Sequence, residues 1–260
     1  MMPTETAPYP VRVRGDLDPA LSRWQWLVKW ILAIPHYVIL IILQIAALVV
    51  TVIAFFAILI TGKYPRALFN FNVGVMRWRW RVTFYALTVL GTDKYPPFSL
   101  QPKSEYPADL EVDYPERLHR GLVLIKWWLL AIPHYLILMV FFGARWFVLG
   151  GYGHRHRGGG HHGDHWGNHW SGGHHGHHWG GEYVTVISVG LIWVLVLIAV
   201  VALLFTARYP KGLFDFLIGI NRWAIRVRTY ASLMRDDYPP FRLDMGAREE
   251  QPAEAPPESG

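Results

Sequence analysis

Long apolar runs limit what this chain can fold into more than any other feature of its sequence. The first run, from Trp24 to Thr61, holds 38 residues and a single charged residue, Lys29. Two further runs extend from Leu122 to Leu149 and from Tyr183 to Phe205, against the roughly 20 apolar residues that a spanning helix needs. Charged residues make up only 17% of the chain, whereas soluble domains carry about 25%. The sequence therefore predicts an integral membrane protein.

The chain also contains a tandem duplication. The segment from Leu32 to Tyr37 recurs unchanged from Leu130 to Tyr135, and each copy closes with Tyr-Pro-Pro-Phe. Between these words, the matching residues are Tyr64-Pro65, Leu68-Phe69, Arg77-Trp78, Arg81-Val82 and Tyr85-Ala86, which reappear at Tyr209-Pro210, Leu213-Phe214, Arg222-Trp223, Arg226-Val227 and Tyr230-Ala231. We therefore divide the chain into an N-terminal tail (1–17), a first copy (18–100), a linker (101–112), a second copy (113–243) with a Gly/His-rich insertion (150–181), and an acidic, proline-rich, disordered tail (244–260).

The first apolar run is too long for one perpendicular span. A helix over all of it would measure about 57 Å, nearly twice the ~30 Å hydrocarbon core. Either a short interfacial helix precedes one crossing, or two helices of about 17 residues form a hairpin. We favour the hairpin, because a hydrophilic insertion cuts the matching run of the second copy. The predicted fold is an all-α integral membrane protein of two tandem repeats, each a transmembrane helical hairpin followed by an amphipathic interfacial helix.

Basic residues predict the orientation of this protein. Lysine and arginine number four in residues 1–29, ten in 62–126, three in 127–207 and eight in 208–260. Cytoplasmic segments are enriched in both. We therefore expect a multi-pass membrane protein with both termini cytoplasmic and the insertion external.

The segments that begin at Pro65 and Pro210 are the predicted interfacial helices. Proline suits a first helical turn, and arginine and tryptophan then recur at equal spacing in both copies. We expect these residues to form a surface for anionic headgroups or a partner protein: Arg77, Trp78, Arg81, Arg222, Trp223 and Arg226. The alternative is that the helices brace the hairpins, with Asp215 satisfying Arg222 and Arg226 internally.

His36 and His134 lie inside apolar runs, where an ionisable side chain is a functional candidate. A proline precedes each and frees a backbone carbonyl one turn earlier. Three alternatives follow for the two histidines: a kink whose polar groups are satisfied locally, a paired proton or metal relay between the two imidazoles, and a position at the membrane interface.

The insertion concentrates ten of the chain's 13 histidines. They are His154, His156, His161, His162, His165, His169, His174, His175, His177 and His178. Imidazole binds zinc, copper and nickel, so weak chelation is expected here, although no cofactor is expected to be required. A low-complexity linker and a loop that gains charge near pH 6.5 are the alternatives.

The sequence contains no Gly-x-Ser-x-Gly or His-Glu-x-x-His pattern and no cysteine. We expect a non-enzymatic protein that organises lipids or partner proteins through its Arg/Trp helices and has no nucleic-acid partner. The alternative is a metal-handling membrane protein that uses the insertion. The Ile-Pro-His-Tyr, Arg-Trp-x-x-Arg-Val and Tyr-Pro-Pro-Phe words resemble an uncharacterised bacterial membrane family, domain of unknown function 4389. This resemblance covers both copies and implies a bacterial origin and a location in the inner membrane, without any reaction or site residue.

Overall fold

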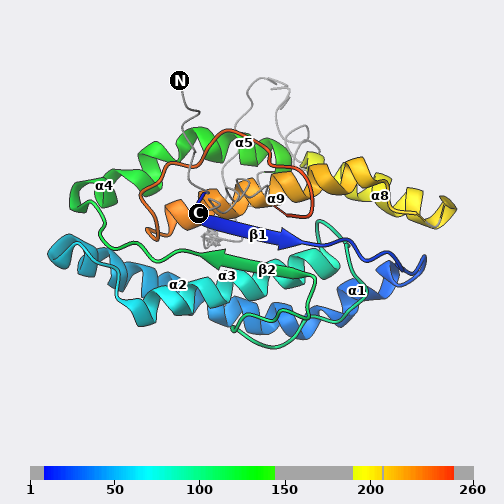
Figure 1. The fold of residues 1–260 in the computed structure, drawn as a ribbon, viewed down its shortest axis with the longest axis horizontal. Coiled ribbons are helices and arrows are strands. Elements are labelled where there is room, and N and C mark those ends of the chain that lie inside the picture. Colours follow the sequence, from blue (N-terminus) through cyan, green and yellow to red (C-terminus); the bar gives the residue numbers. More distant parts are fainter. Residues whose placement is uncertain (1–8, 144–189, 207, 249–260) are drawn as a thin grey trace, which may run out of the picture.

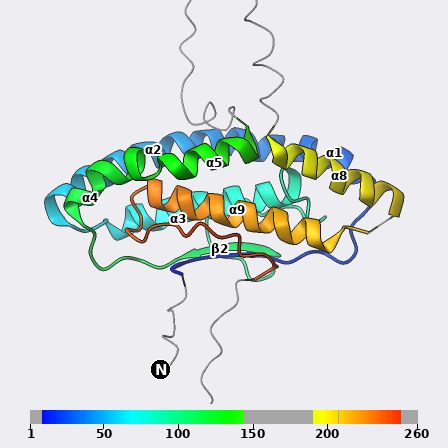
Figure 2. The same cartoon turned by 90° about the horizontal axis from the view of Figure 1, so that it is seen from above.

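The computed structural model describes residues 9–143, 190–206 and 208–248. The elements follow one another as β1 (Val11–Gly15), α1 (Trp26–Leu32), α2 (Ile34–Thr61), α3 (Arg66–Ala86), β2 (Ala108–Val112), α4 (Arg120–Ile125), the π-helix η1 (Lys126–Leu130), α5 (Ile132–Phe142), α8 (Leu191–Thr206) and α9 (Lys211–Ala231) (Figure 1). They stack in three layers (Figure 2). The apolar helices α1, α2, α4, α5 and α8 form one layer, α3 and α9 form the middle one, and the sheet lies on the far side.

The all-α prediction is wrong, because β1 and β2 form an antiparallel sheet. The strands lie in the segments that we took for a tail and a linker, and Val13 pairs with Leu110 at the centre of the register. Val11 and Val13 are buried while Arg12 points outward, as the alternation of a strand requires. Five residues on each strand give too short a pattern to stand out in a mainly helical chain.

The predicted hairpin within the first apolar run is also wrong. Helix α2 runs for 28 residues without an interruption that would divide it into two helices. It carries Pro35 in its first turn, where the missing N–H costs nothing, and ends at Gly62, whose φ of 69° is the left-handed conformation that favours glycine. A short α1 followed by one long helix corresponds to the alternative that we had set aside.

A different hairpin forms, between each apolar helix and the amphipathic helix after it. In the first copy α2 turns into α3 through residues 62–65. Asn72 on α3 ties the two helices together, because its Nδ2 donates to Thr51 Oγ1 on α2 (3.1 Å) and to the Tyr64 hydroxyl in the turn (2.8 Å). Helices α8 and α9 follow each other in the same way in the second copy.

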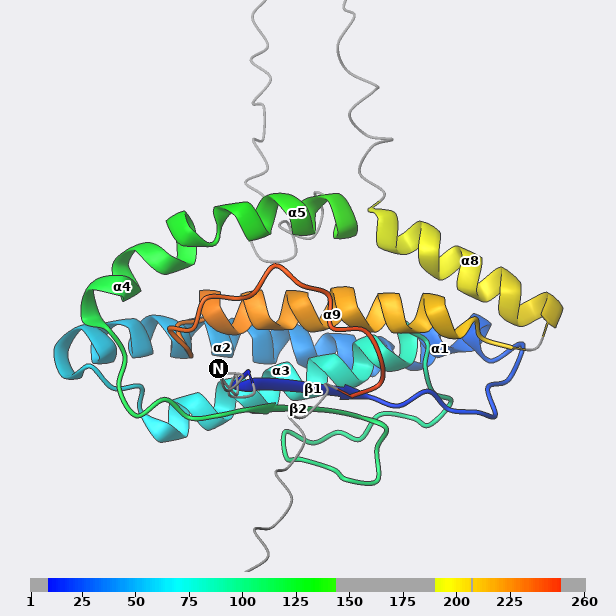
Figure 3. The ribbon, with the colours of Figure 1, turned by 45° about the horizontal axis from the view of Figure 1, so that its top comes forward.

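The insertion interrupts a single helix and does not separate the two helices of a transmembrane hairpin. Helices α5 and α8 run end to end (Figure 3), and Gly190 packs so closely that an added Cβ would lie 2.2 Å from the carbonyl carbon of Phe142. Together, the 11 residues of α5 and the 16 residues of α8 nearly equal the 28 residues of α2. The two helices together therefore correspond to α2, and the insertion separates them in the sequence between Gly143 and Gly190.

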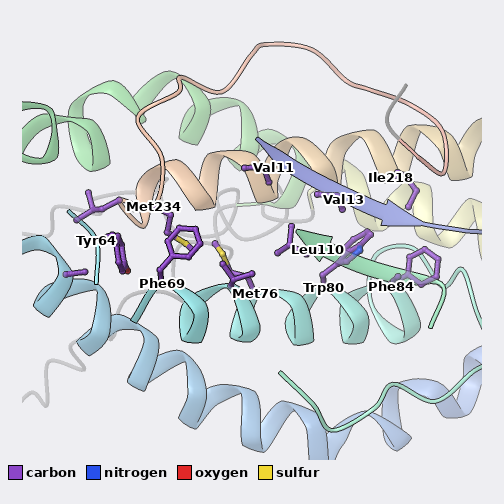
Figure 4. Close-up of a cluster of buried hydrophobic side chains, with 14 of the residues drawn as sticks. Val11, Val13, Tyr64, Phe69, Met76, Trp80, Phe84, Leu110, Ile218 and Met234 are labelled. Atoms are coloured by element: carbon purple, nitrogen blue, oxygen red, sulfur yellow. The ribbon is translucent and has the colours of Figure 1, made fainter. Parts of the chain in front are cut away.

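The main core lies between the sheet and the middle layer. Figure 4 shows Val11 and Val13 of β1 meeting Trp80 and Phe84 of α3 and Ile218 of α9. Helices α3 and α9 are antiparallel, since Thr88, just after α3, donates to Asn221 Oδ1 (2.9 Å) and Thr229 lies against Met76.

The apolar layer exposes its outer face. Ile42 and Ile60 on α2 are 63% and 74% exposed, and Phe205 on α8 is 84% exposed. Within the described residues, Ile34–Thr61 and Arg120–Phe142 are long and apolar enough to cross a membrane, and Leu191–Thr206 is shorter. These helices support membrane association by length and composition.

Candidate functional site

The three sequence words of the first copy meet in one cluster around His36. The His36 ring is buried and stacks on Phe98, with 3.9 Å between ring centroids. Tyr95 lies at 4.9 Å on the same centroid measure, and Trp78 Nε1 donates to His36 Nδ1 (3.0 Å). We call this group the first aromatic box.

A second aromatic box surrounds His134. This buried ring stacks on Phe241 at 4.1 Å between centroids, with Tyr238 at 4.9 Å and Trp223 at 5.5 Å. The Tyr-Pro-Pro-Phe closure thus has the same task in both copies, which is to place a tyrosine and a phenylalanine against the histidine.

The tyrosine of each box satisfies a backbone carbonyl at the start of the proline-containing helix. The Tyr95 hydroxyl donates to the Leu32 carbonyl oxygen (3.1 Å), and the Tyr238 hydroxyl donates to that of Leu130 (3.3 Å). We had considered the histidines as donors to a freed carbonyl, but His36 Nδ1 is an acceptor from Trp78. His36 Nε2 and both ring nitrogens of His134 have no hydrogen-bond partner among the described residues, so the alternative of locally satisfied polar groups holds for His36 Nδ1 alone.

The two boxes do not form a joint metal or proton relay in the described part of the chain. His36 packs with residues of α3, whereas His134 packs with residues of α9. No group of three or more histidine, aspartate or glutamate side chains suited to a metal ion occurs among the described residues.

A buried lysine–aspartate pair adjoins each box, and sequence reasoning missed both. Lys29 Nζ lies 2.7 Å from Asp93 Oδ1 and Lys126 Nζ lies 2.7 Å from Asp236 Oδ1. Each ammonium group also faces a tyrosine ring, that of Tyr85 or its counterpart Tyr230, at 5.4 and 5.7 Å. The available signal was a lysine inside an apolar run together with an aspartate two residues before each Tyr-Pro-Pro-Phe closure.

Burial sets the protonation behaviour of these pairs. It lowers the pKa of Lys29, although Asp93 opposes the shift. At Asp236 burial opposes ionisation, but hydrogen bonds from Lys126 and from the His119 backbone outweigh it, so the pKa of Asp236 is below its ordinary 3.8. Lys29 and Asp236 each belong to an ion pair that stabilises the fold, the first with Asp93 and the second with Lys126.

The π-helix η1 keeps the second pair in register. The first copy has seven positions from Lys29 to His36, whereas the second has eight from Lys126 to His134. A π-helical turn widens the backbone by one residue, and η1 occupies Lys126–Leu130. It therefore absorbs the extra residue, so that both Lys126 and His134 reach their partners.

The predicted Arg/Trp surface lies inside the protein. Arg81 and Arg222 have no exposed surface and Arg226 has 1%, while Trp78 and Trp223 are 6% and 4% exposed. The expectation that these side chains face lipid phosphate is therefore wrong.

The arginines brace the middle layer against the sheet and the chain after each closure. Arg77 Nε and Arg81 Nη2 lie 3.0 and 3.2 Å from Asp109 Oδ1 on β2. Arg222 Nη2 donates to the Val13 carbonyl on β1 (3.0 Å), and Arg226 Nη1 lies 2.5 Å from Asp244 Oδ2. The bracing alternative thus describes these residues, with Asp244 rather than Asp215 as the acid. The beginning of the predicted disordered tail is consequently held in place.

Comparison with known families identifies the chain. The model of a domain of unknown function, DUF4389, matches residues 23–99 and 183–242, which together exceed half of the sequence. The chain belongs to the DUF4389 family. Comparisons with curated proteins and with solved structures give no match.

The DUF4389 match contains the whole first aromatic box with Lys29 and Asp93, and resumes after the insertion. In the second copy it contains Trp223 and the closure but not Lys126 or His134. The ten histidines of the insertion lie outside the described residues, so their predicted metal binding stays a prediction. The hydrogen bond from Trp78 to His36 and the two lysine–aspartate pairs fix helices in place within the described residues.

Proposed function

We propose that this DUF4389 protein is a non-enzymatic membrane protein that organises lipids or partner proteins from one side of a bilayer. Its apolar layer would lie flat within a single leaflet, parallel to the membrane plane. The observation that carries the proposal is the parallel stacking of the apolar helices, the middle layer and the sheet (Figure 2). The exposed apolar face is on one side of this stack and the sheet on the other.

A crossing orientation of α2 is hard to reconcile with that stacking. If α2 ran along the membrane normal, α3 and the sheet packed beside it would also lie at the depth of the hydrocarbon. The sheet carries the ion pair of Arg12 with Asp113 (2.8 Å), whose side chains are 37% and 48% exposed. Charges and open sheet edges are costly when they face lipid, which favours the flat orientation.

The dimensions and the exposed side chains also suit a flat orientation. A helix with its side chains is about 10–12 Å wide, and one leaflet contributes about half of the ~30 Å hydrocarbon core. One layer of helices therefore fits in one leaflet. Trp30, Trp127 and Trp193 are exposed in this layer, and tryptophan prefers the boundary between acyl chains and headgroups.

We further propose that the sheet side faces the cytoplasm of a bacterial cell, as the distribution of basic residues favours. Both termini would then be cytoplasmic. The external position of the insertion stays a prediction, because residues 144–189 lie outside the described part of the chain.

Depth measurements on single cysteines test the flat orientation, because the natural chain has no cysteine to remove. Val38, Leu48 and Ile60 are exposed along α2, and the outer two are about 33 Å apart along the helix axis. A fluorophore at each position should report similar depth when quenched by nitroxide lipids. A probe at Glu111 on the sheet is the control and should remain in water.

A spanning α2 would give a different profile. Leu48 would then lie near the bilayer midplane, with Val38 and Ile60 near opposite surfaces, and that gradient would overturn the flat orientation. A protein that does not float with phosphatidylcholine vesicles at all would overturn membrane association itself.

A further inference from the structure

Two arginines of the middle layer differ from all the cations described so far. Carboxylates or backbone carbonyls hold the charged groups of the braces and of the lysine–aspartate pairs. Within the described residues, Arg79 on α3 and Arg228 on α9 have no carboxylate at ion-pair distance. Both side chains are half-buried, so they are enclosed by protein and still reachable from outside.

Arg79 and Arg228 lie at the same level of the antiparallel helices α3 and α9, because Met76, one turn before Arg79, contacts Thr229, the neighbour of Arg228 (4.0 Å). Arg228 Nη2 donates a hydrogen bond to Oε1 of Gln44, which is the single residue of α2 with a side-chain amide. Burial lowers the pKa of both arginines, and the charge of Arg79 lowers that of Arg228 further. Since arginine does not lose its proton in proteins, these shifts express the cost of burying two guanidinium groups, to which repulsion adds at Arg228.

The duplicated framework does not require this pair. Counting from Tyr64 to its equivalent Tyr209, Arg79 corresponds to Ala224 and Arg228 corresponds to Thr83. The second copy packs Ala224 against apolar side chains in a closed cluster. The same fold position is thus stable without an arginine, which separates this pair from the braces at equivalent positions in both copies.

The pair also lies next to the exposed apolar face. Gln44 is half-buried between Ile41 and Ile45, which are 60% and 46% exposed on α2. A ligand with an anionic group and apolar chains would place the first near the guanidinium groups and the second along the apolar layer.

We propose that Arg79 and Arg228, assisted by Gln44, form a binding site for an anionic phosphate group. Guanidinium groups bind phosphate through paired N–H donors, and one phosphate offsets the repulsion between the two cations. The phosphate belongs either to a lipid headgroup or to a free anion. The lipid source rests on the proposed membrane association, which brings headgroups and acyl chains to this region.

The test compares Arg79→Gln/Arg228→Gln with Arg117→Gln/Arg208→Gln, a control with the same charge change at two exposed arginines. Flotation is measured with phosphatidylcholine vesicles and with vesicles that also contain phosphatidylglycerol. At about 1 kcal/mol per cation near an anionic surface, the wild-type preference for phosphatidylglycerol should fall at least about tenfold in the site variant. The control should keep most of its preference, and binding to phosphatidylcholine should be unchanged in both.

A second arm measures thermal stability in neutral detergent with millimolar inorganic phosphate, against chloride at equal ionic strength. Stabilisation of the wild type but not of the site variant supports a site that accepts free phosphate. Phosphatidylglycerol preference without that stabilisation supports a headgroup site.

Several results would overturn the phosphate site. They are a wild type that responds in neither arm, a site variant that responds as the wild type does, and a site variant that fails to fold, because unpaired charges should be dispensable for folding. If the wild type does not bind phosphatidylcholine vesicles, the proposed membrane association is overturned instead. The measurement in detergent would still test the phosphate site.

Discussion

At the scale of single residues, the two aromatic boxes are nearly identical and differ in one hydrogen bond. Trp78 Nε1 donates to His36 Nδ1, whereas the indole nitrogen of Trp223 has no hydrogen-bond partner among the described residues. Removing one partner of a buried bond leaves the other unsatisfied, at a cost of about 1–3 kcal/mol. The difference between the boxes therefore offers an internal control.

We predict that Trp78→Phe destabilises the protein more than Trp223→Phe, by about 1–2 kcal/mol. Both changes remove a similar amount of ring, but only the first leaves the His36 acceptor without its donor. Thermal unfolding of the two variants in the same detergent measures the difference. Equal losses would mean that the hydrogen bond contributes nothing beyond packing.

The second residue-scale prediction concerns pH. The pKa of Asp236 is lowered in the folded state, so its contribution to stability is present above its ordinary pKa near 3.8 and is lost as pH falls through the lowered value. Asp236→Asn should cost about 3 kcal/mol at neutral pH, because it leaves Lys126 buried without its charge partner.

Thermal stability of the wild type and of Asp236→Asn across pH 3 to 7 checks this. The two curves should draw closer as pH falls below 3.8, because the wild-type protein then begins to lose the contribution of its ionised carboxylate. A difference that stays constant over the whole range would assign the loss to packing rather than to the ion pair.

At the scale of elements, the sequence predicted the helices that carry strong local signals. Proline at positions 65 and 210 marked the starts of α3 and α9, and the apolar runs marked α2 and α8. The strands were missed because each has only five residues and gains its stability from pairing across 97 positions of sequence. Which helices form a hairpin also depends on long-range packing, here of Asn72 against Thr51.

The candidate site was partly predictable. The repeated words identified His36 and His134 and the tryptophans, since they recur unchanged. Their partners did not follow from the pattern, because amphipathic periodicity shows that arginines share a face but not what covers that face. Arg81 and Arg222 meet the sheet and not lipid, and a sequence reading that omits the sheet assigns them to phosphate.

The π-helix gives a prediction at the element scale. Deleting Trp128 reduces the spacing from Lys126 to His134 to the seven positions of the first copy, so a regular α-helix should then place both side chains correctly. We expect this deletion to remain folded with a small change in melting temperature. Deleting Trp30 from α1 should rotate Lys29 by about 100° away from Asp93 and be strongly destabilising.

Circular dichroism and thermal unfolding of the two deletion variants decide the matter. Each removes one exposed tryptophan, so the loss of apolar area is matched. If deletion of Trp128 is as damaging as deletion of Trp30, the π-helix has a role of its own beyond absorbing one residue.

At the scale of the whole molecule, the two copies are arranged around the centre of the sheet. Val13 and Leu110 pair at the middle of the register and are 97 positions apart, as are Lys29 and Lys126. The antiparallel α3 and α9 pack on one side of the sheet, with the apolar α2 beyond α3 and the apolar α5 beyond α9 (Figure 1). This arrangement makes the interrupted helix α5–α8 the counterpart of the continuous α2.

That correspondence predicts that the insertion is dispensable for folding. Replacing residues 143–190 by a single alanine would join the 11 residues of α5 to the 16 of α8 in a helix of 28 residues, the length of α2. Alanine removes both glycines and favours a helix. We expect the shortened protein to float with vesicles and to melt within a few degrees of the full chain, because the described core contacts remain.

The same shortened protein also tests the metal-binding prediction for the insertion. We expect calorimetry to detect weak zinc or copper binding by the full chain and none by the shortened protein, since ten histidines leave with the insertion. A full-length variant with those ten histidines changed to serine is the matched control, and it should lose metal binding while keeping the loop. Undiminished metal affinity in both variants would move the site to His36 and His134. Failure of the shortened protein to fold would mean that the break between α5 and α8 is required, and that the two copies are not interchangeable at this helix.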